Sequence, residues 1–168
     1  MTEGAEFARP VPLDQIVERP RVMEISANEA ERQALAERFG LVGLKRLEAK
    51  VRLSRSGVFY RIEADWEADV VQTCVVTLEP LENHLADHLV ERYGPTERQE
   101  AEIDLDPETD EIEEIEGGAI DIGETVAQAL SLALDPYPRK PGVKVEIPGG
   151  HEGGEGPFAA LSKLKKGS

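Results

Sequence analysis

The chain lacks the features on which several common protein classes depend. Its 168 residues include one cysteine, which excludes an internal disulfide and a zinc site built on a CxxC pair. Aromatic residues make up only 5%, which predicts a modest core. No window approaches about 18 uninterrupted apolar residues, and the first residues are acidic. We therefore expect a cytoplasmic protein with neither a membrane span nor a signal peptide.

Basic residues are also scarce. The chain has 19 Lys and Arg against 34 Asp and Glu, a net charge of −15. Direct binding to a nucleic-acid backbone needs clustered cations, so this balance argues against it. The same charge suits solubility, or a basic protein partner that is steered electrostatically to its site.

The clearest pattern present is an almost unbroken alternation of apolar and polar residues over Val58–Val70, which predicts a strand with one buried face. Residues 47–53 alternate in the same way, and the turn Ser54–Gly57 joins the two into an antiparallel hairpin. The length of the second strand predicts a bend or bulge between Ala64 and Ala68. The inward face comprises Val58, Tyr60, Ile62, Ala64, Trp66, Ala68 and Val70.

Two helices are expected beside this sheet. Ser26–Glu29 has the spacing of a capping box, with a helix to about Phe39 that ends at Gly40. A second helix follows Ile122, runs to about Leu134 and ends at Asp135-Pro136. The residues expected to face the core are Ala30, Ala34, Leu35 and Phe39 in the first helix, and Ile122, Val126, Ala129, Leu130, Ala133 and Leu134 in the second.

Other segments complete the predicted fold. Residues 7–16 read as a short edge strand, while Leu81–Tyr93 fits either a helix, with leucines four apart, or one face of a strand. The fold class is α+β, a bent antiparallel sheet packed against two helices, with an acidic loop and a flexible Gly/Pro-rich tail. The domain is expected over residues 1–140, with a linker and a short basic amphipathic tail over 141–168.

One stretch has the appearance of a catalytic motif. His84-Leu85-Ala86-Asp87-His88 on a helix would place both histidines on one face with a carboxylate beside them, which suggests a metal-dependent hydrolase. On a strand the two histidines would lie about 13 Å apart, too far for one metal. Cys74 and Trp66 are expected in the core.

Three segments are candidate contact surfaces. Residues 97–116 hold eleven acidic residues and one arginine, so they form either a solvated loop or a docking strip for a basic partner. The proline-rich segment 135–141 is either a rigid exit from the second helix or a contact site for RNA or an acidic surface. The lysine-bearing tail, which includes Lys165 and Lys166, is a further candidate for contact with RNA. The candidate partner-binding residues are Asp110, Glu111, Glu113, Glu114, Tyr137, Arg139, Lys140, Phe158 and Lys163.

Two strings resemble the signatures of a known family. Residues 72–80, Gln-Thr-Cys-Val-Val-Thr-Leu-Glu-Pro, resemble the cysteine-containing signature of the YceD family. Residues 119–140 look like its second signature, an acidic stretch leading into a helix and a proline exit, and residues 157–161 are similar to the end of alphaproteobacterial members. The signature residues are Cys74, Thr77, Leu78, Pro80, Asp121, Leu134, Pro136 and Pro138.

The resemblance implies a role in the accumulation of large-subunit ribosomal RNA. Family members are typically encoded beside a small zinc-binding protein of the large ribosomal subunit. Many relatives have a second cysteine where this chain has Thr77, which puts a metal or redox role here in doubt. The resemblance supplies no catalytic residue and no cofactor, and it favours a strand over residues 81–93.

The leading hypothesis is therefore a non-enzymatic ribosome-biogenesis factor that binds a basic ribosomal protein or pre-ribosomal particle, with possible RNA contact. No small-molecule substrate and no membrane are expected. The alternatives are the metal-dependent hydrolase, built on His84, Asp87 and His88, and an acidic mimic of nucleic acid.

Overall fold

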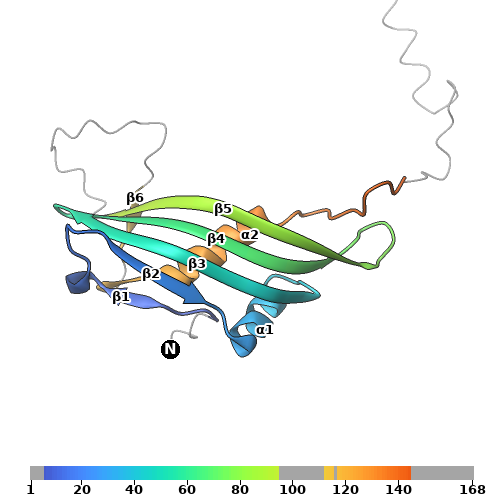
Figure 1. The fold of residues 1–168 in the computed structure, drawn as a ribbon, viewed down its shortest axis with the longest axis horizontal. Helices are drawn as coiled ribbons and strands as arrows, with labels where there is room; N and C mark the ends of the chain where they lie inside the picture. The colour runs from blue at the N-terminus through green and yellow to red at the C-terminus, as the bar shows by residue number, and fades with distance from the viewer. Residues whose placement is uncertain (1–5, 95–111, 116, 145–168) are drawn as a thin grey trace, which may run out of the picture.

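The protein is built on a five-stranded sheet with helices on one side (Figure 1). The computed structural model describes residues 6–94, 112–115 and 117–144. The large sheet has the order β2-β3-β4-β5-β6, and β1 pairs with β7 in a separate two-stranded sheet. The α+β class is confirmed. The sheet is antiparallel except at β6, which pairs parallel with the end of β5.

The elements follow one another as β1 (Pro10–Pro12), a 3-10 turn (Leu13–Gln15), β2 (Arg21–Ser26), α1 (Glu29–Arg38), β3 (Gly43–Ser56), β4 (Phe59–Thr73), β5 (Pro80–Gly94), β6 (Ile112–Glu114), β7 (Ala119–Asp121) and α2 (Ile122–Ala133). The strand over 81–93 and the short strand within 7–16 are confirmed. Strand β2 is an addition, since no pattern in the sequence predicted it.

The alternating run is the centre of the sheet. The predicted inward residues from Ile62 to Val70 are buried, whereas Val58 is 58% exposed because it lies in the β3–β4 turn. Of the predicted bend or bulge between Ala64 and Ala68, the bulge is wrong, since β4 pairs without interruption with both neighbours there. The register shift falls instead in β3, between Leu44 and Arg46.

Helix α1 begins two residues later than predicted. Asn28 is the cap, and it exchanges hydrogen bonds with Glu31, which makes these two residues the capping box. Ser26 cannot cap the helix because it is still paired with Glu48 as the last residue of β2. Ala30 is exposed, while Gly40, with φ of +65°, ends the helix as expected.

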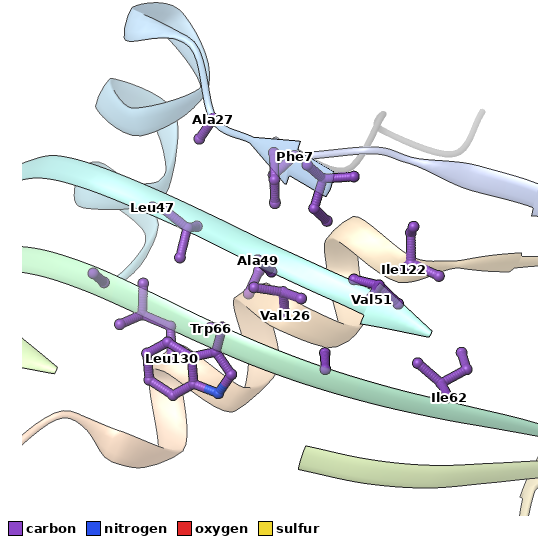
Figure 2. Close-up of a cluster of buried hydrophobic side chains, with 14 of the residues drawn as sticks. Phe7, Ala27, Leu47, Ala49, Val51, Ile62, Trp66, Ile122, Val126 and Leu130 are labelled. Atoms are coloured by element: carbon purple, nitrogen blue, oxygen red, sulfur yellow. The ribbon is translucent and has the colours of Figure 1, made fainter. Parts of the chain in front are cut away.

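Helix α2 crosses the inner face of the sheet (Figures 1 and 2). Ile122, Val126 and Leu130 face the strands and are fully buried, which confirms the predicted stripe. Ala133, the last residue of the helix, is exposed, and Ala127 is buried. The side chains opposite α2 in Figure 2 include Leu47, Ala49, Val51, Ile62 and Trp66.

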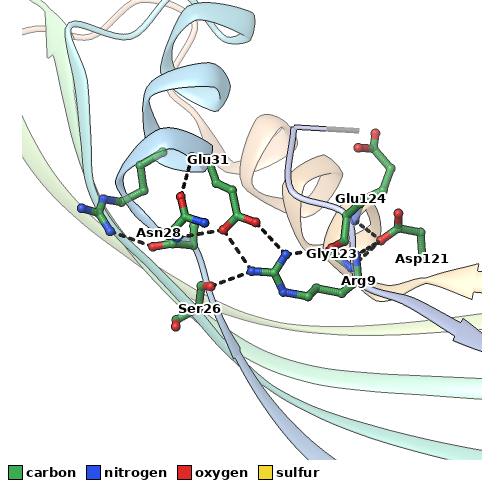
Figure 3. Close-up of polar contacts among 10 residues, drawn as sticks. Arg9, Ser26, Asn28, Glu31, Asp121, Gly123 and Glu124 are labelled. Atoms are coloured by element: carbon green, nitrogen blue, oxygen red, sulfur yellow. Dashed lines mark hydrogen bonds and ion pairs between the residues drawn. The ribbon is translucent and has the colours of Figure 1, made fainter. Parts of the chain in front are cut away.

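The N-terminal segment is held against both helices (Figure 3). Arg9 forms two hydrogen bonds with Glu31, at 2.7 and 2.9 Å, and its backbone N–H donates to Asp121 at 2.7 Å. Asp121 also caps α2 by accepting from Gly123 and Glu124. We call this set, with Ser26 and Asn28, the Arg9 network. It joins β1 and the starts of α1 and α2 into one unit.

Candidate interaction site

Residues of the two signature strings lie together at one end of the molecule, although they are more than fifty positions apart in the sequence. The first supplies the β4–β5 turn, residues 74–79, and the second supplies residues 135–140, which follow α2. We call these two segments together the tip. The Val75 N–H donates to the Pro138 carbonyl at 2.9 Å, and the Lys140 amino group pairs with Glu79 at 2.6 Å.

Cys74 lies at the centre of the tip and has no exposed surface. The Lys140 N–H points at its sulfur at 3.4 Å. Hydrogen bonding from Thr77, through its side chain and its amide, together with the amides of Lys140 and Val76, lowers the pKa of the Cys74 thiol to about 6. The interpretation of Cys74 as a core residue is confirmed. Its sulfur is also a hydrogen-bond acceptor that holds the two segments together.

The turn presents apolar side chains outward. Leu78 is 76% exposed and has φ of +59°, while Tyr137 is 70% exposed on the adjoining segment. A leucine in the left-handed region is strained by about 1–2 kcal/mol, and Leu78 recovers none of this by burial. Arg139 is exposed as well. The tip therefore offers an aliphatic group, a phenol ring and a guanidinium to solvent.

The other signature residues support this arrangement. Pro80 starts β5, Pro138 is buried, Leu134 is the C-terminal cap of α2 and Pro136 is exposed. Of the candidate partner-binding residues, Tyr137, Arg139 and Lys140 are together at the tip, whereas Glu113 is exposed on β6 at the opposite end of β5. Glu114 belongs to β6. The described residues do not include Asp110, Glu111, Phe158, Lys163, Lys165 or Lys166.

The motif at residues 84–88 does not form a metal site. His84 and His88 lie on the outer face of β5 and contact different carboxylates of β4, Asp69 at 2.7 Å and Asp65 at 2.8 Å. Asp87 pairs with Trp66, so by register it belongs to the inner face. Within residues 6–94, 112–115 and 117–144, no three metal-ligating side chains are grouped. This geometry gives no support to the hydrolase alternative.

The outer face of the sheet carries a hollow of about 800 Å³ that spans four strands. Its charged lining residues are acidic apart from Lys50, and Ala86 leaves space at its floor. Arg46 beside it contacts Glu67 and Asp69 at 2.8 and 2.9 Å. These ion pairs neutralise charges between neighbouring strands of the same face, which is typical of a solvated sheet surface.

Comparison with known proteins gives one match. A family model described as Large ribosomal RNA subunit accumulation protein YceD matches residues 62–165, more than half of the chain. The match contains both segments of the tip. No curated protein and no solved structure matches the chain. No helix in the described part of the chain is long and apolar enough to cross a membrane.

Proposed function

The chain belongs to the YceD family, and on that premise we propose that it is a non-enzymatic ribosome-biogenesis factor. It supports the accumulation of large-subunit ribosomal RNA by binding a basic ribosomal protein, pre-ribosomal RNA or both. The family description carries the link to ribosomal RNA. The mode of action is argued below from the surface of this chain.

The observation that carries a binding role is Leu78. A strained, exposed leucine contributes nothing to the core, and glycine would occupy the same backbone conformation without cost. Backbone strain that the fold does not need points to a function for the side chain. Tyr137, on the other signature, lies on the same tip and is equally exposed. Tyrosine is enriched among the residues that contribute most to binding at interfaces.

Charge suggests how the partners are divided. The chain carries −15, which favours a basic protein as the principal partner. The tip differs from this average, because Arg139 is exposed there and Tyr137 provides a ring on which a base can stack. We therefore assign RNA contact, where it occurs, to the tip, and contact with a basic ribosomal protein to the acidic surfaces.

A single substitution separates binding from folding at the tip. Leu78→Gly removes the exposed side chain and relieves the strained φ, so the free energy of unfolding should stay equal or rise by about 1 kcal/mol. Recovery of large-subunit precursor particles with the tagged protein should fall about tenfold, and large-subunit ribosomal RNA should decline when the variant replaces the native chain. The measurements are thermal unfolding, pull-down with protein and RNA identification, and quantification of both ribosomal RNAs.

The matched control is Val58→Gly. Val58 is 58% exposed in the β3–β4 turn, at the opposite end of β4, so its loss should leave both the pull-down and the RNA level unchanged. The proposal of a binding tip is wrong if Leu78→Gly retains native recovery. The wider proposal is wrong if the native chain recovers no ribosomal component and its removal leaves large-subunit RNA unchanged.

A further inference from the structure

Strand β5 has an open edge. It is 15 residues long, and all of it except Gly94 pairs with β4 on one side. On the other side, β6 covers only residues 92–94. Among the described residues no strand and no backbone hydrogen bond covers the remaining edge, residues 81–91 (Figure 1). Such an edge presents unpaired N–H and C=O groups that can accept another strand.

This edge lacks most of the devices that prevent strand addition. Residues 81–91 contain no lysine, arginine or proline, and the register with β4 shows no bulge. The opposite edge of the sheet is different, because β2 has only six residues, follows Pro20 and starts with Arg21. The long edge is therefore the one suited to pairing.

The side chains along the open edge specify what it can accept. Leu81, Leu85 and Leu89 are half-buried at the border of the inner face, so an added strand would cover them further. The charged side chains of this segment are all acidic apart from its two histidines. Glu82 is 70% exposed, Asp87 is exposed on the inner face and Glu91 is half-buried. Acidic groups interleaved with leucines suit a strand that alternates basic and apolar residues.

We propose that the open edge of β5, residues 81–91, binds an extended basic segment of a protein partner as an additional strand of the sheet. Main-chain hydrogen bonds supply the pairing, and the carboxylates select lysine or arginine. A second copy is disfavoured as the occupant, because it would bring the same acidic edges of two chains of net charge −15 together. The inference rests on the proposed function for the identity of that partner as a ribosomal protein.

The test uses the full chain and a defined probe. The probe is a blocked peptide of about ten alternating lysines and valines, and the control peptide has glutamate in place of lysine. Hydrogen exchange of the backbone amides should slow by about tenfold or more in residues 81–91 with the lysine peptide, and not with the glutamate peptide. Protection confined to the β2 and β3 part of the outer-face hollow, around Glu24 and Lys50, would overturn the proposal.

Charge reversal at the edge gives the second arm. The double variant Glu82→Lys and Asp87→Lys should weaken peptide binding by about tenfold or more. The charge-matched control is Glu29→Lys with Glu37→Lys, at two exposed positions of α1, and should retain at least half the native affinity. Equal weakening in both variants would mean binding by net charge alone, which contradicts the proposal. Circular dichroism verifies that each variant is folded.

Three further outcomes are decisive. If sedimentation shows a dimer whose residues 81–91 are protected without any peptide, the occupant is a second copy and the proposal is wrong. If the edge variant loses a ribosomal protein from the pull-down while Leu78→Gly keeps it, the edge is supported independently of the tip. If the edge variant keeps the native set of ribosomal components, the edge proposal fails and the proposed function stands.

Discussion

The Arg9 network and the tip use similar means to join distant segments, but they leave different surfaces. In the Arg9 network, Arg9 contacts Glu31 and Asp121 from two other elements, and its guanidinium lies 4.6 Å from the ring of Phe7, which is fully buried. In the tip, the buried Cys74 sulfur and the exposed Lys140–Glu79 pair join the two segments, and Leu78 and Tyr137 are directed to solvent.

The difference separates stability from function. The Arg9 network covers apolar surface, which is what a stabilising contact does. The tip holds a turn rigidly around Cys74 and exposes apolar groups, which is the arrangement of a preorganised binding surface. Substitutions in the Arg9 network should therefore change the free energy of unfolding and leave the affinity for the partner unchanged. Substitutions of the exposed tip residues should change that affinity and leave the free energy of unfolding unchanged.

The largest expected effect is that of Gly123→Ala. A Cβ at this position would lie 1.9 Å from the Phe7 carbonyl oxygen, which is backbone and cannot turn away. The N-terminal segment would have to leave α2 and expose Phe7, at a cost of about 3 kcal/mol or more. Chemical denaturation measures the loss, and tip-dependent recovery of precursor particles should persist below the melting temperature.

The control for this variant is Gly43→Ala. Its added Cβ would meet only Val71, at the ordinary contact distance of 3.9 Å, and Gly43 has no positive φ. The expected change is less than about 1 kcal/mol. Similar losses in both variants would show that the close approach of Phe7 to α2 is not what stabilises this end.

Arg9→Met tests the ionic part of the same region. Its removal should cost about 1–2 kcal/mol at pH 7, since it leaves the partly buried Glu31 without its partner. The hydrogen bond from Arg9 is the main cause that lowers the pKa of Glu31 in the folded state. The stabilisation is therefore complete above the pKa of the unfolded chain, near 4.3, and is lost as the pH falls through the pKa of the folded state.

The cost of Arg9→Met should therefore shrink below about pH 4, as denaturation at several pH values would show. Arg52→Met is the comparison, because Arg52 is 58% exposed and lies 3.9 Å from Glu63. Its effect should not exceed about 0.5 kcal/mol. A cost for Arg9→Met that stays constant with pH would assign the effect to packing over Phe7.

The strands of the sheet could be predicted from the sequence because the spacing of apolar residues along a short segment is enough to identify them. Alternation from Ile62 to Val70 follows directly from the two-residue period of a strand, and the stripe of Ile122, Val126 and Leu130 follows from the helical period. The inner position of Asp87 was also open to prediction, once residues 81–93 are taken as a strand.

What could not be predicted depends on contacts between distant segments. Strand β2 has weak alternation and exists because β3 offers it an edge. Ser26 satisfies the pattern of a cap, but pairing with Glu48 extends β2 through it. The meeting of Cys74 with Lys140 has no local signal either, since the nearby residues of Cys74 suggested only a small core side chain. Membership of both strings in family signatures was the one indication that they act together.

Cys74→Ser probes the inner part of the tip and should reduce thermal stability less than Arg9→Met does. Hydrogen bonds from Thr77 and from the amides lower the thiol pKa to about 6, so the folded state favours the thiolate. That contribution is complete above the unfolded pKa near 8.5 and is lost as the pH falls through 6. Native stability should rise from pH 6 to 9, and the serine variant should lack this rise.

Thiolate ultraviolet absorbance of the native chain provides an independent measurement of the same titration. If the thiol ionises at its ordinary pKa, Cys74 is a packing residue and the sulfur does not hold the two segments. In the serine variant, the Val75 amide, which donates to Pro138, should also exchange faster than in the native chain.

Glu91→Gln should have the smallest effect, and it should be stabilising. Burial raises the pKa of Glu91, although the Tyr93 hydroxyl donates to it at 2.6 Å. Because the pKa of Glu91 is raised in the folded state, its contribution to stability is present below the pKa of the unfolded chain, near 4.3. That contribution is lost as the pH rises through the pKa of the folded state. Glutamine keeps an acceptor for Tyr93 and removes the charge, so it should gain about 0.5 kcal/mol at neutral pH, allowing for solvent screening.

The gain from Glu91→Gln should vanish near pH 4, where the native carboxyl is protonated as well. The site sharpens the contrast between the two regions because Tyr93 contacts Thr125, whose hydroxyl donates to the carbonyl of Asp121 in the Arg9 network. The variant should therefore raise the melting temperature. A gain of equal size at pH 4 and pH 7 would trace the effect to packing against α2, since protonation would then have no part in it.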